Sequence, residues 1–304
     1  MTLREKYQSI LTIRELQPNS IKTYMAIFDS FVRYCESIKT SPKNIQREHL
    51  LFYLSQIKSE STRIQANGML QNLYNFVLEQ GLKTNGIPNP KRHHHVVDYL
   101  SLYELNLIFN HVKNAKQRTI LKVLYSCALR GSEACNIKKK DFIKKFDGQK
   151  YVYDLRICGK GGHTDVIPVP QETITEIKNY YPTLSEKDKQ SEYLFPGQFK
   201  DGYSLRTVQT IVTDAMKELH IKKEGKHSSH LFRISRGTHF LLAGIDISFV
   251  QKFLRHRNIK TTQTYYNGVK TDDMRVVFST ADNFLKESLS LELNQQSQKQ
   301  IKAA

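Results

Sequence analysis

A stretch of turn-forming residues separates two helix-forming parts of this 304-residue chain, and it constrains the organisation of the chain most. The stretch reads KTNGIPNPKRHHH over residues 83–95, with two prolines and no apolar periodicity. Proline removes a backbone donor and fixes φ, so it interrupts helices and central strands. The parts on either side are each long enough to bury a core. We therefore predict two domains, over residues 1–90 and 99–280, joined by a linker at 91–98.

The first part has the apolar spacing of a small helical bundle. Apolar side chains recur at three- and four-residue steps from Asn19 to Thr40, and similar runs cover residues 47–57 and 61–80. Ser20 is expected to cap the first of these helices, and Gly81 to end the third.

The second part is predicted to be mainly helical with a small antiparallel sheet. Ser101 and Glu104 form the pattern of a capping box, which indicates the start of a helix. Residues 151–169 alternate in hydrophobicity on both sides of a GKGG turn at residues 159–162, as expected of two paired strands.

The charge of the chain favours a polyanionic partner. Lysine and arginine total 46 against 29 aspartate and glutamate, for a net charge of +17 that both parts share. Neutralising phosphates with such cations releases condensed counterions. Ribosomal and membrane-surface proteins share this composition, so charge alone is weak evidence.

Several other classes of protein are disfavoured. No apolar run reaches the roughly 18 residues that a membrane-spanning helix needs. The N-terminus, MTLREKYQSI, lacks the apolar core of a signal peptide. The four cysteines show no CxxC spacing, so neither a zinc site nor a disulfide framework is indicated. We expect a cytoplasmic protein with no membrane association.

Six side chains of the second part have the chemistry to hold a phosphodiester and to attack it with a phenol. The planar fork of arginine donates two parallel bonds to phosphate oxygens. A histidine and an arginine three residues apart share one face of a helix and can form an anion site at its N-terminus. The candidates are Arg130, Lys160, His230, Arg233, His256 and Tyr265.

Each of these residues taken singly has a plainer explanation. Arg130 could be a helix-end arginine that complements the helix dipole. The GKGG turn lacks the spacing of a nucleotide-binding P-loop, and a lysine in a turn is commonly just exposed. A lone His256 would more often be a surface residue. Only their order along the chain gives them weight.

This order resembles the tyrosine recombinases, the class of phage integrases and Xer chromosome-dimer resolvases. The matching segments are ALRGSEA around Arg130, GKGG followed by VIPVP, HLFR at residues 230–233, LRH at 254–256 and TTQTYY at 261–266. The resemblance runs from about Tyr99 to about Asn267. Since the family places its nucleophile nine residues after the last His or Trp of the site, Tyr265 is selected over Tyr266.

The resemblance implies a mechanism that uses no metal and no other cofactor. Tyr265 would attack a scissile phosphate and form a 3′-phosphotyrosyl bond. The two arginines and two histidines would stabilise the pentacovalent phosphorane, and Lys160, in a mobile hairpin, would protonate the leaving 5′ oxygen. The chain would thus be a site-specific recombinase, acting in integration, excision or resolution.

The resemblance also implies an architecture and partners. The expected fold is a two-domain clamp on double-stranded DNA, with an N-terminal helical core-binding (SAM-like) domain and a C-terminal catalytic domain. Recombination would need a homo-tetramer on two recombination sites, with accessory DNA-bending proteins as further candidate partners. Residues 281–304 would form a tail that supplies an inter-subunit helix and then becomes disordered.

Departures from the family pattern leave alternatives open. Ile234 stands where histidine is frequent, and Arg255 stands where glycine is usual. Either the backbone at Arg255 differs from the family, or this arginine adds a phosphate contact. Two other functions also stay open: a DNA-relaxing enzyme of the type IB topoisomerase kind, and a catalytically inactive DNA-binding protein. The histidines at residues 93–95 are interpreted as part of the linker, touching DNA backbone, and not as metal ligands.

Overall fold

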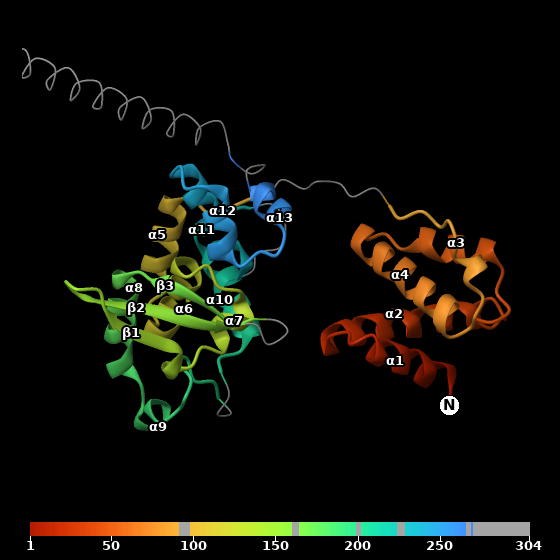
Figure 1. Ribbon diagram of the computed structural model, residues 1–304, viewed down its shortest axis with the longest axis horizontal. Coiled ribbons are helices and arrows are strands. Elements are labelled where there is room, and N and C mark those ends of the chain that lie inside the picture. The colour runs from red at the N-terminus through yellow and green to blue at the C-terminus, as the bar shows by residue number, and fades with distance from the viewer. Residues whose placement is uncertain (91–97, 160–163, 199–201, 224–228, 266–268, 270–304) are drawn as a thin grey trace, which may run out of the picture. The chain divides into compact units, whose positions relative to one another are not determined.

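The computed structural model describes residues 1–90, 98–159, 164–198, 202–223, 229–265 and 269. The chain divides into two compact units, Met1–His94 and His95–Ala304, each with its own hydrophobic core (Figure 1). Among the described residues, no helix is both long enough and apolar enough to cross a membrane.

The first unit is helical throughout its regular structure. Its helices pack around a core that includes the stacked rings of Tyr7 and Phe28, 5.1 Å apart. The elements are α1 (Leu3–Ile13), α2 (Pro18–Ser37), α3 (Arg47–Gln56), α4 (Glu60–Phe76) and the short 3₁₀ helix η1 (Gly81–Lys83).

Two predicted helix ends in this unit are wrong. Helix α2 begins at Pro18 rather than after Ser20, because proline has the φ of a first helical residue and lacks only a donor that would be unpaired there. Helix α4 ends at Phe76, and the turn that follows uses Glu79 in the left-handed region, with φ 54°. Gly81 therefore lies in η1 and does not end α4.

The turn-forming stretch at residues 83–95 packs onto the first unit over part of its length. The side-chain amide of Asn67, on α4, donates to the backbone oxygen of Ile87 at 3.3 Å and to the side chain of Asn89 at 2.9 Å. Ile87 is itself buried in the core of the first unit. The stretch from residue 83 to 90 therefore belongs to the first unit, and residues 91–97, including the three histidines, lie outside the described residues.

The second unit combines helices with one three-stranded antiparallel sheet in the order β1-β2-β3. Its strands are β1 (Phe142–Phe146), β2 (Tyr151–Cys158) and β3 (Thr164–Val169). Its helices are α5 (Leu102–His111), α6 (Ala115–Ser126), α7 (Gly131–Cys135), η2 (Lys139–Asp141), α8 (Gln171–Tyr180), η3 (Tyr181–Thr183), α9 (Glu186–Lys189), α10 (Leu205–Glu218), α11 (His230–Leu242), α12 (Ile247–Leu254) and α13 (Ile259–Gln263).

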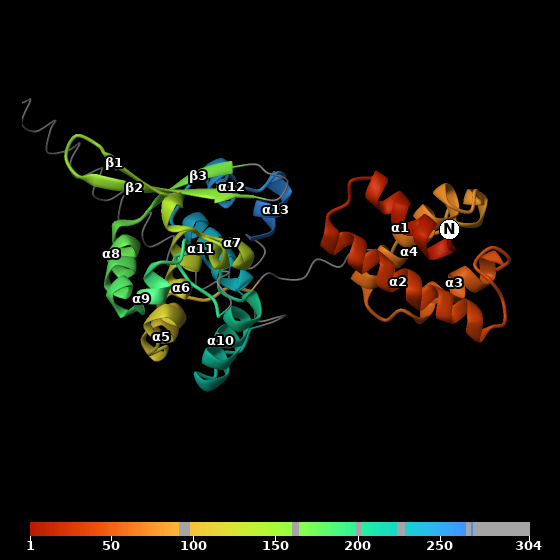
Figure 2. The ribbon, with the colours of Figure 1, turned by 90° about the horizontal axis from the view of Figure 1, so that it is seen from below.

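The sheet and the helices of this unit share one core. Leu155 and Ile157 of β2 are buried on the face that packs on the helices, as their alternation predicts. Helix α6 packs against both α8 and α11, so it lies between the sheet side of the unit and the helices that follow (Figures 1 and 2). The predicted mainly helical class with a small sheet is confirmed; strand β1 is an addition to it.

Local signals place several ends correctly in the second unit. The hydroxyl of Ser101 accepts from the backbone of Glu104 at 3.2 Å, and the Glu104 carboxylate accepts from the backbone of Ser101 at 2.7 Å, which completes the predicted capping box. Gly244, with φ 76°, follows the end of α11, and Asp246 accepts from the backbone of Ser248 at 2.8 Å to cap α12.

Candidate active site

Arg130 stands immediately before α7, on a short turn after α6. The turn is made by Ala128, whose φ of 46° lies in the left-handed region. Gly131 serves a different purpose. A Cβ at that position would lie 2.3 Å from the hydroxyl oxygen of Ser229, so only glycine lets α7 approach the start of α11 this closely. Arg130 is thereby brought beside α11.

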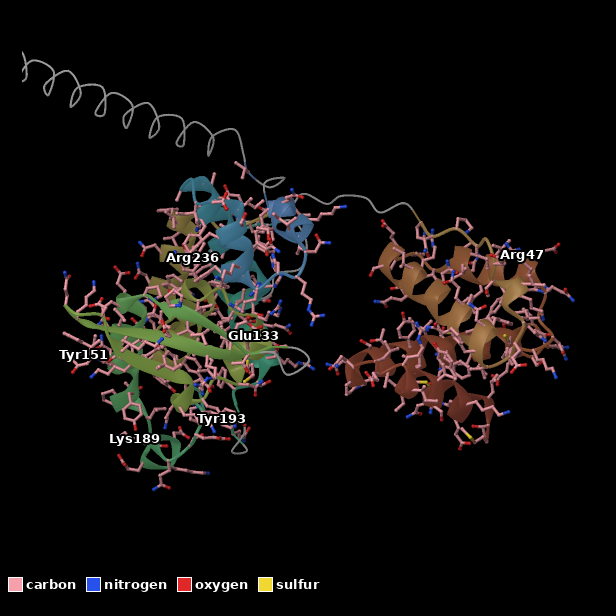
Figure 3. All side chains as sticks on the ribbon, in the orientation of Figure 1. Arg47, Glu133, Tyr151, Lys189, Tyr193 and Arg236 are labelled. Atoms are coloured by element: carbon pink, nitrogen blue, oxygen red, sulfur yellow. The ribbon has the colours of Figure 1, made fainter. Side chains whose placement is uncertain are left out.

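Glu133 holds Arg130 in place through two contacts. Its carboxylate accepts from the backbone N–H of Arg130 at 2.8 Å and from the guanidinium at 2.6 Å. The Glu133 side chain is only 7% exposed, whereas that of Arg130 is 43% exposed. Burial would raise the pKa of Glu133, but Arg255 and Arg130 outweigh it, and the pKa lies below its usual value. A buried carboxylate (labelled in Figure 3) thus anchors an arginine that solvent can reach.

His230 and Arg233 lie on the first turn of α11, as the sequence predicts. Arg233 is fully buried and donates to the backbone oxygen of Ala128 at 2.6 Å and to that of Leu254. Burial, together with Arg255 and Arg130, lowers the pKa of Arg233 to about 10, so the group still carries its charge at neutral pH. Burial and the two arginines Arg233 and Arg130 also lower the pKa of His230.

Arg255 follows α12 in the left-handed region, with φ 55° and ψ 44°. The backbone therefore adopts the conformation that favours glycine, although the side chain is a large one. The guanidinium turns inward: its side chain is 4% exposed, and it donates to the Glu133 carboxylate at 2.8 Å and to the backbone oxygen of Ala128 at 3.3 Å. Glu133 therefore lies between two arginines from distant parts of the chain.

His256 and Tyr265 face each other at the end of the described chain. Their rings lie 5.7 Å apart in an edge-to-face arrangement, and the Nδ1 atom of His256 lies 2.9 Å from the hydroxyl oxygen of the buried Thr262. Burial, then the charge of Arg233 and other cations, lowers the pKa of His256 to about 4. Its ring is therefore neutral at physiological pH in the DNA-free protein.

The phenol of Tyr265 is enclosed beside Arg233. Its side chain is 3% exposed, and within the described residues its oxygen forms no hydrogen bond of normal geometry. Burial raises the pKa of Tyr265, while the charges of Arg233 and Arg130 act against that rise. The Nε atom of Arg233 is also buried without a partner among the described residues. A hydrogen-bonding interaction with the Arg233 side chain also acts to lower the pKa of Tyr265, so the two groups lie in the same small region.

Gly237 provides the room for the Tyr265 ring, and the sequence analysis did not single it out. A Cβ at Gly237 would lie 2.6 Å from Cε2 of Tyr265 and 2.9 Å from Cδ1 of Leu254. The position is four residues after Arg233, so both lie on the same face of α11. The four-residue step from Arg233 was the one feature of the sequence that pointed to Gly237.

Five of the six predicted site residues come together in the second unit. Arg130, His230, Arg233, His256 and Tyr265 are linked by pKa effects or contacts, although Arg130 precedes the other four by 100 residues or more. Lys160 and Tyr266 lie outside the described residues; β2 and β3 pair up to Cys158 and Thr164 on either side of the lysine turn. Within the described ranges, no group of three or more His, Cys, Asp or Glu side chains could hold a metal ion.

Comparison with known proteins identifies the family. The model of the phage integrase family matches residues 98–271, which is more than half of the chain. This chain belongs to the phage integrase family. Tyrosine recombinase XerA of Pyrococcus furiosus is 30% identical over 269 residues, covering 86% of this chain and 87% of that protein. The tyrosine recombinase of Pseudothermotoga lettingae is 26% identical over 271 residues, covering 86% and 91%.

Solved structures share the fold. XerH recombinase bound to a palindromic difH substrate, in a post-cleavage complex, matches with a TM-score of 0.72 and 19% identity over 92% of this chain and 84% of that one. A lambda integrase dimer bound to a COC′ core site matches with a TM-score of 0.70 and 16% identity over 88% and 95%. As a tyrosine recombinase, the chain is an enzyme that cleaves and rejoins DNA in site-specific recombination through a tyrosine intermediate, which confirms the predicted family and activity.

We expect Gly237→Val to impair catalysis by displacing the Tyr265 ring. A shift of about 1 Å in a reacting group can cost about 10²-fold in rate, so covalent attachment to DNA should slow by that order while DNA affinity changes little. Single-turnover attachment kinetics measure the first quantity and a binding titration the second. Thr238→Val, one residue along α11, is the matched control, because the Thr238 hydroxyl has no partner among the described residues. An attachment rate equal to that of the wild type would show that Gly237 does not position the ring.

A second expectation concerns His256 in the DNA-free protein. Because burial and nearby cations favour its neutral form, the ring should gain its proton only near pH 4, well below the usual 6.5. An NMR titration of protein labelled with ¹³C-histidine measures the midpoint, and a His256→Asn variant assigns the resonance. Titration of that resonance near pH 6.5 would mean that His256 is exposed to solvent and lies apart from the arginines.

Proposed function

We propose that this tyrosine recombinase cleaves double-stranded DNA with Tyr265 as nucleophile, assisted by Arg130, Lys160, His230, Arg233 and His256. The phenol oxygen attacks the scissile phosphorus, a 3′-phosphotyrosyl bond forms, and the 5′ oxygen leaves as a hydroxyl. The observation that carries the proposal is the gathering of Tyr265, two arginines and two histidines at the junction of α7, α11 and the segment after α12.

The arginines supply the positive charge for the transition state. Arg130 is held by Glu133 yet 43% exposed, so a phosphate can reach its free donors. Arg233 is fixed to two backbone oxygens and keeps an unpaired Nε. An unpaired buried donor costs about 1–3 kcal/mol, and a phosphate oxygen at that place would offset the cost. Donors fixed before the reaction are the basis of electrostatic catalysis.

Ionisation of Tyr265 needs the loaded site. In the DNA-free protein burial holds its pKa above the usual value, so the phenol stays protonated. The charges of Arg233 and Arg130 lower the cost of forming the phenolate, and both lie close enough to act on it. We infer that Tyr265 loses its proton only as it attacks the phosphate.

Lys160 is proposed as the general acid that protonates the departing 5′ oxygen. It lies between β2 and β3 in the sequence, outside the described residues. The phosphotyrosyl bond conserves the energy of the cleaved phosphodiester, so a 5′ hydroxyl from a partner strand can attack it without ATP. No metal or other cofactor enters this sequence of steps.

Strand exchange requires several protomers, and we propose a homo-tetramer on two recombination sites. A lambda integrase tetramer bound to a Holliday junction shares this fold with a TM-score of 0.70 and 16% identity, over 89% of this chain and 78% of that one. The first unit, residues 1–90, would be the core-binding domain of a clamp on the duplex, and residues 99–280 the catalytic domain. The tail at residues 281–304 and accessory DNA-bending proteins complete the proposed assembly. The reaction would take place on cytoplasmic DNA.

Tyr265→Phe should abolish covalent attachment while leaving duplex binding nearly intact, because only the hydroxyl is lost. Tyr266→Phe is the matched control and should keep most activity. The measurement is trapping of covalent complex on a nicked suicide substrate in excess EDTA, since the proposed mechanism uses no metal.

The same assay on intact substrates separates the alternatives. Relaxed supercoiled plasmid without recombinants would indicate a topoisomerase, and binding without covalent complex an inactive protein. Covalent complex formed by Tyr265→Phe, or lost only in Tyr266→Phe, would assign the nucleophile to the other tyrosine.

Substrates with sulfur at the 5′ bridging position should distinguish Lys160 from Arg130. Each alanine variant should slow cleavage by about 10²–10³-fold, by analogy with loss of one oxyanion donor. A thiolate leaves without a proton, so the sulfur substrate should rescue Lys160→Ala. It should not rescue Arg130→Ala, whose partner is a non-bridging oxygen. Rescue of both variants, or of neither, would contradict the assignment of Lys160 as general acid.

A further inference from the structure

We propose that Arg255 is a positioning residue that holds Arg130 in its catalytic place through Glu133, without touching the DNA itself. The inference rests on the proposed role of Arg130 in cleavage and adds a residue to that site. It follows from three features of Arg255: where its donors point, how little of it is exposed, and what its carboxylate partner does.

The donors of Arg255 are directed into the protein. One terminal nitrogen contacts both the Glu133 carboxylate, at 2.8 Å, and the backbone oxygen of Ala128, at 3.3 Å. The other donates to the backbone oxygen of Phe253 at 3.0 Å. Only 4% of the side chain is exposed, and its charge is already compensated by the Glu133 carboxylate, whereas Arg233 donates to backbone oxygens. The Nε atom of Arg255 is buried without a partner among the described residues. The ion pair within the protein therefore disfavours a direct phosphate contact, one of the two explanations that the sequence left open.

Glu133 connects Arg255 to the exposed arginine. The same carboxylate binds the backbone and the side chain of Arg130 through its two oxygens. Removing one of the two cationic partners of a buried carboxylate is costly, because its charge is then less well compensated. The position of Glu133 therefore depends on both Arg255 and Arg130. Arg255 thus fixes the anchor from which Arg130 reaches the substrate.

Ala128 ties Arg255 to Arg233 as well. The backbone oxygen of Ala128 accepts from Arg233 at 2.6 Å and from Arg255 at 3.3 Å. Ala128 is the left-handed residue of the turn that leads into Arg130, with φ 46°. Two buried guanidinium groups therefore hold this strained turn through the backbone oxygen of Ala128, and Glu133 holds it through the backbone N–H of Arg130.

The left-handed backbone of Arg255 supports a role for the side chain. A residue with a Cβ is strained in this conformation, and glycine would avoid that strain. The hydrogen bonds and the ion pair of the guanidinium offset this strain.

The test compares Arg255→Met, Arg255→Lys, Glu133→Gln and the double variant Arg255→Met/Glu133→Gln. Methionine retains a long side chain and the same backbone strain but removes the charge and the donors. Arg118→Met is the matched control, because it removes another Arg–Glu pair of this unit, 3.3 Å from Glu176. Each variant is assayed for the single-turnover rate of covalent attachment at saturating DNA, for DNA affinity and for thermal unfolding.

We expect Arg255→Met to slow attachment by about 10²-fold, the effect of a misplaced catalytic group, with DNA affinity close to that of the wild type. Arg255→Lys, which keeps the charge, should recover part of the rate and covers the case in which the methionine variant does not fold. The double variant should be no slower than Glu133→Gln, because both changes break the same series of contacts from Arg255 through Glu133 to Arg130. Arg118→Met should attach at the wild-type rate.

The dependence of the attachment rate on pH gives a readout that simple packing would not move. Glu133 faces Arg130 and Arg255, and Arg233 and His230 of α11 also lie near it. Loss of Arg255 removes a cation that keeps the pKa of Glu133 low. The carboxylate of Arg255→Met should then take up a proton at higher pH than in the wild type, so the acid limb of the profile should move to higher pH.

Three results would overturn the inference. Attachment by Arg255→Met and Arg255→Lys at the wild-type rate would show that the residue has no catalytic influence. Equal slowing in the presence and absence of Glu133→Gln, or a loss confined to DNA affinity, would show that Arg255 acts on DNA directly. Absence of covalent complex in the wild-type protein would instead remove the proposed function, which separates that failure from those three results.

Discussion

The site depends on one buried carboxylate placed among positive charges. Three arginines lie close together, and burial with the charges of Arg255 and Arg130 lowers the pKa of the fully buried Arg233 to about 10. Such a cluster would repel itself if its charges were not compensated. Glu133 neutralises two of the three directly, and backbone oxygens accept hydrogen bonds from the two buried ones. One carboxylate serves three arginines, so the cluster stays net positive, and Arg130 is its most exposed member.

The same charges set the protonation states of the site. His256 and His230 have lowered pKa values because burial and the arginines disfavour a further positive charge. Tyr265 keeps its proton because burial disfavours the phenolate. The DNA-free protein therefore holds neutral histidines and a neutral Tyr265 around fixed cations. A phosphodiester brings the negative charge that this arrangement lacks, so binding and activation of the site are parts of one electrostatic event.

Close approaches between elements make this arrangement sterically feasible. Gly131 lets α7 begin against Ser229, and Gly237 leaves space on α11 for the Tyr265 ring. Both glycines have ordinary helical positions, so their value lies in the absent side chain and not in unusual backbone angles. The unusual angles fall instead on Ala128 and Arg255, which have side chains and are held by hydrogen bonds.

The sequence by itself determined the family, the class of fold and the order of the candidate residues, because these depend on local spacing. The three-residue step from His230 to Arg233 and the capping box at Ser101 are properties of single helices. Tertiary structure alone decided what Arg255 and Gly237 do. Their partners, Glu133 and Tyr265, are 122 and 28 residues away along the chain, and no local pattern specifies which side chains meet when helices pack. The sequence left open whether the backbone at Arg255 differs from the family or its side chain adds a phosphate contact. The contact between Arg255 and Glu133 of α7, which only tertiary structure provides, directs the side chain into the protein.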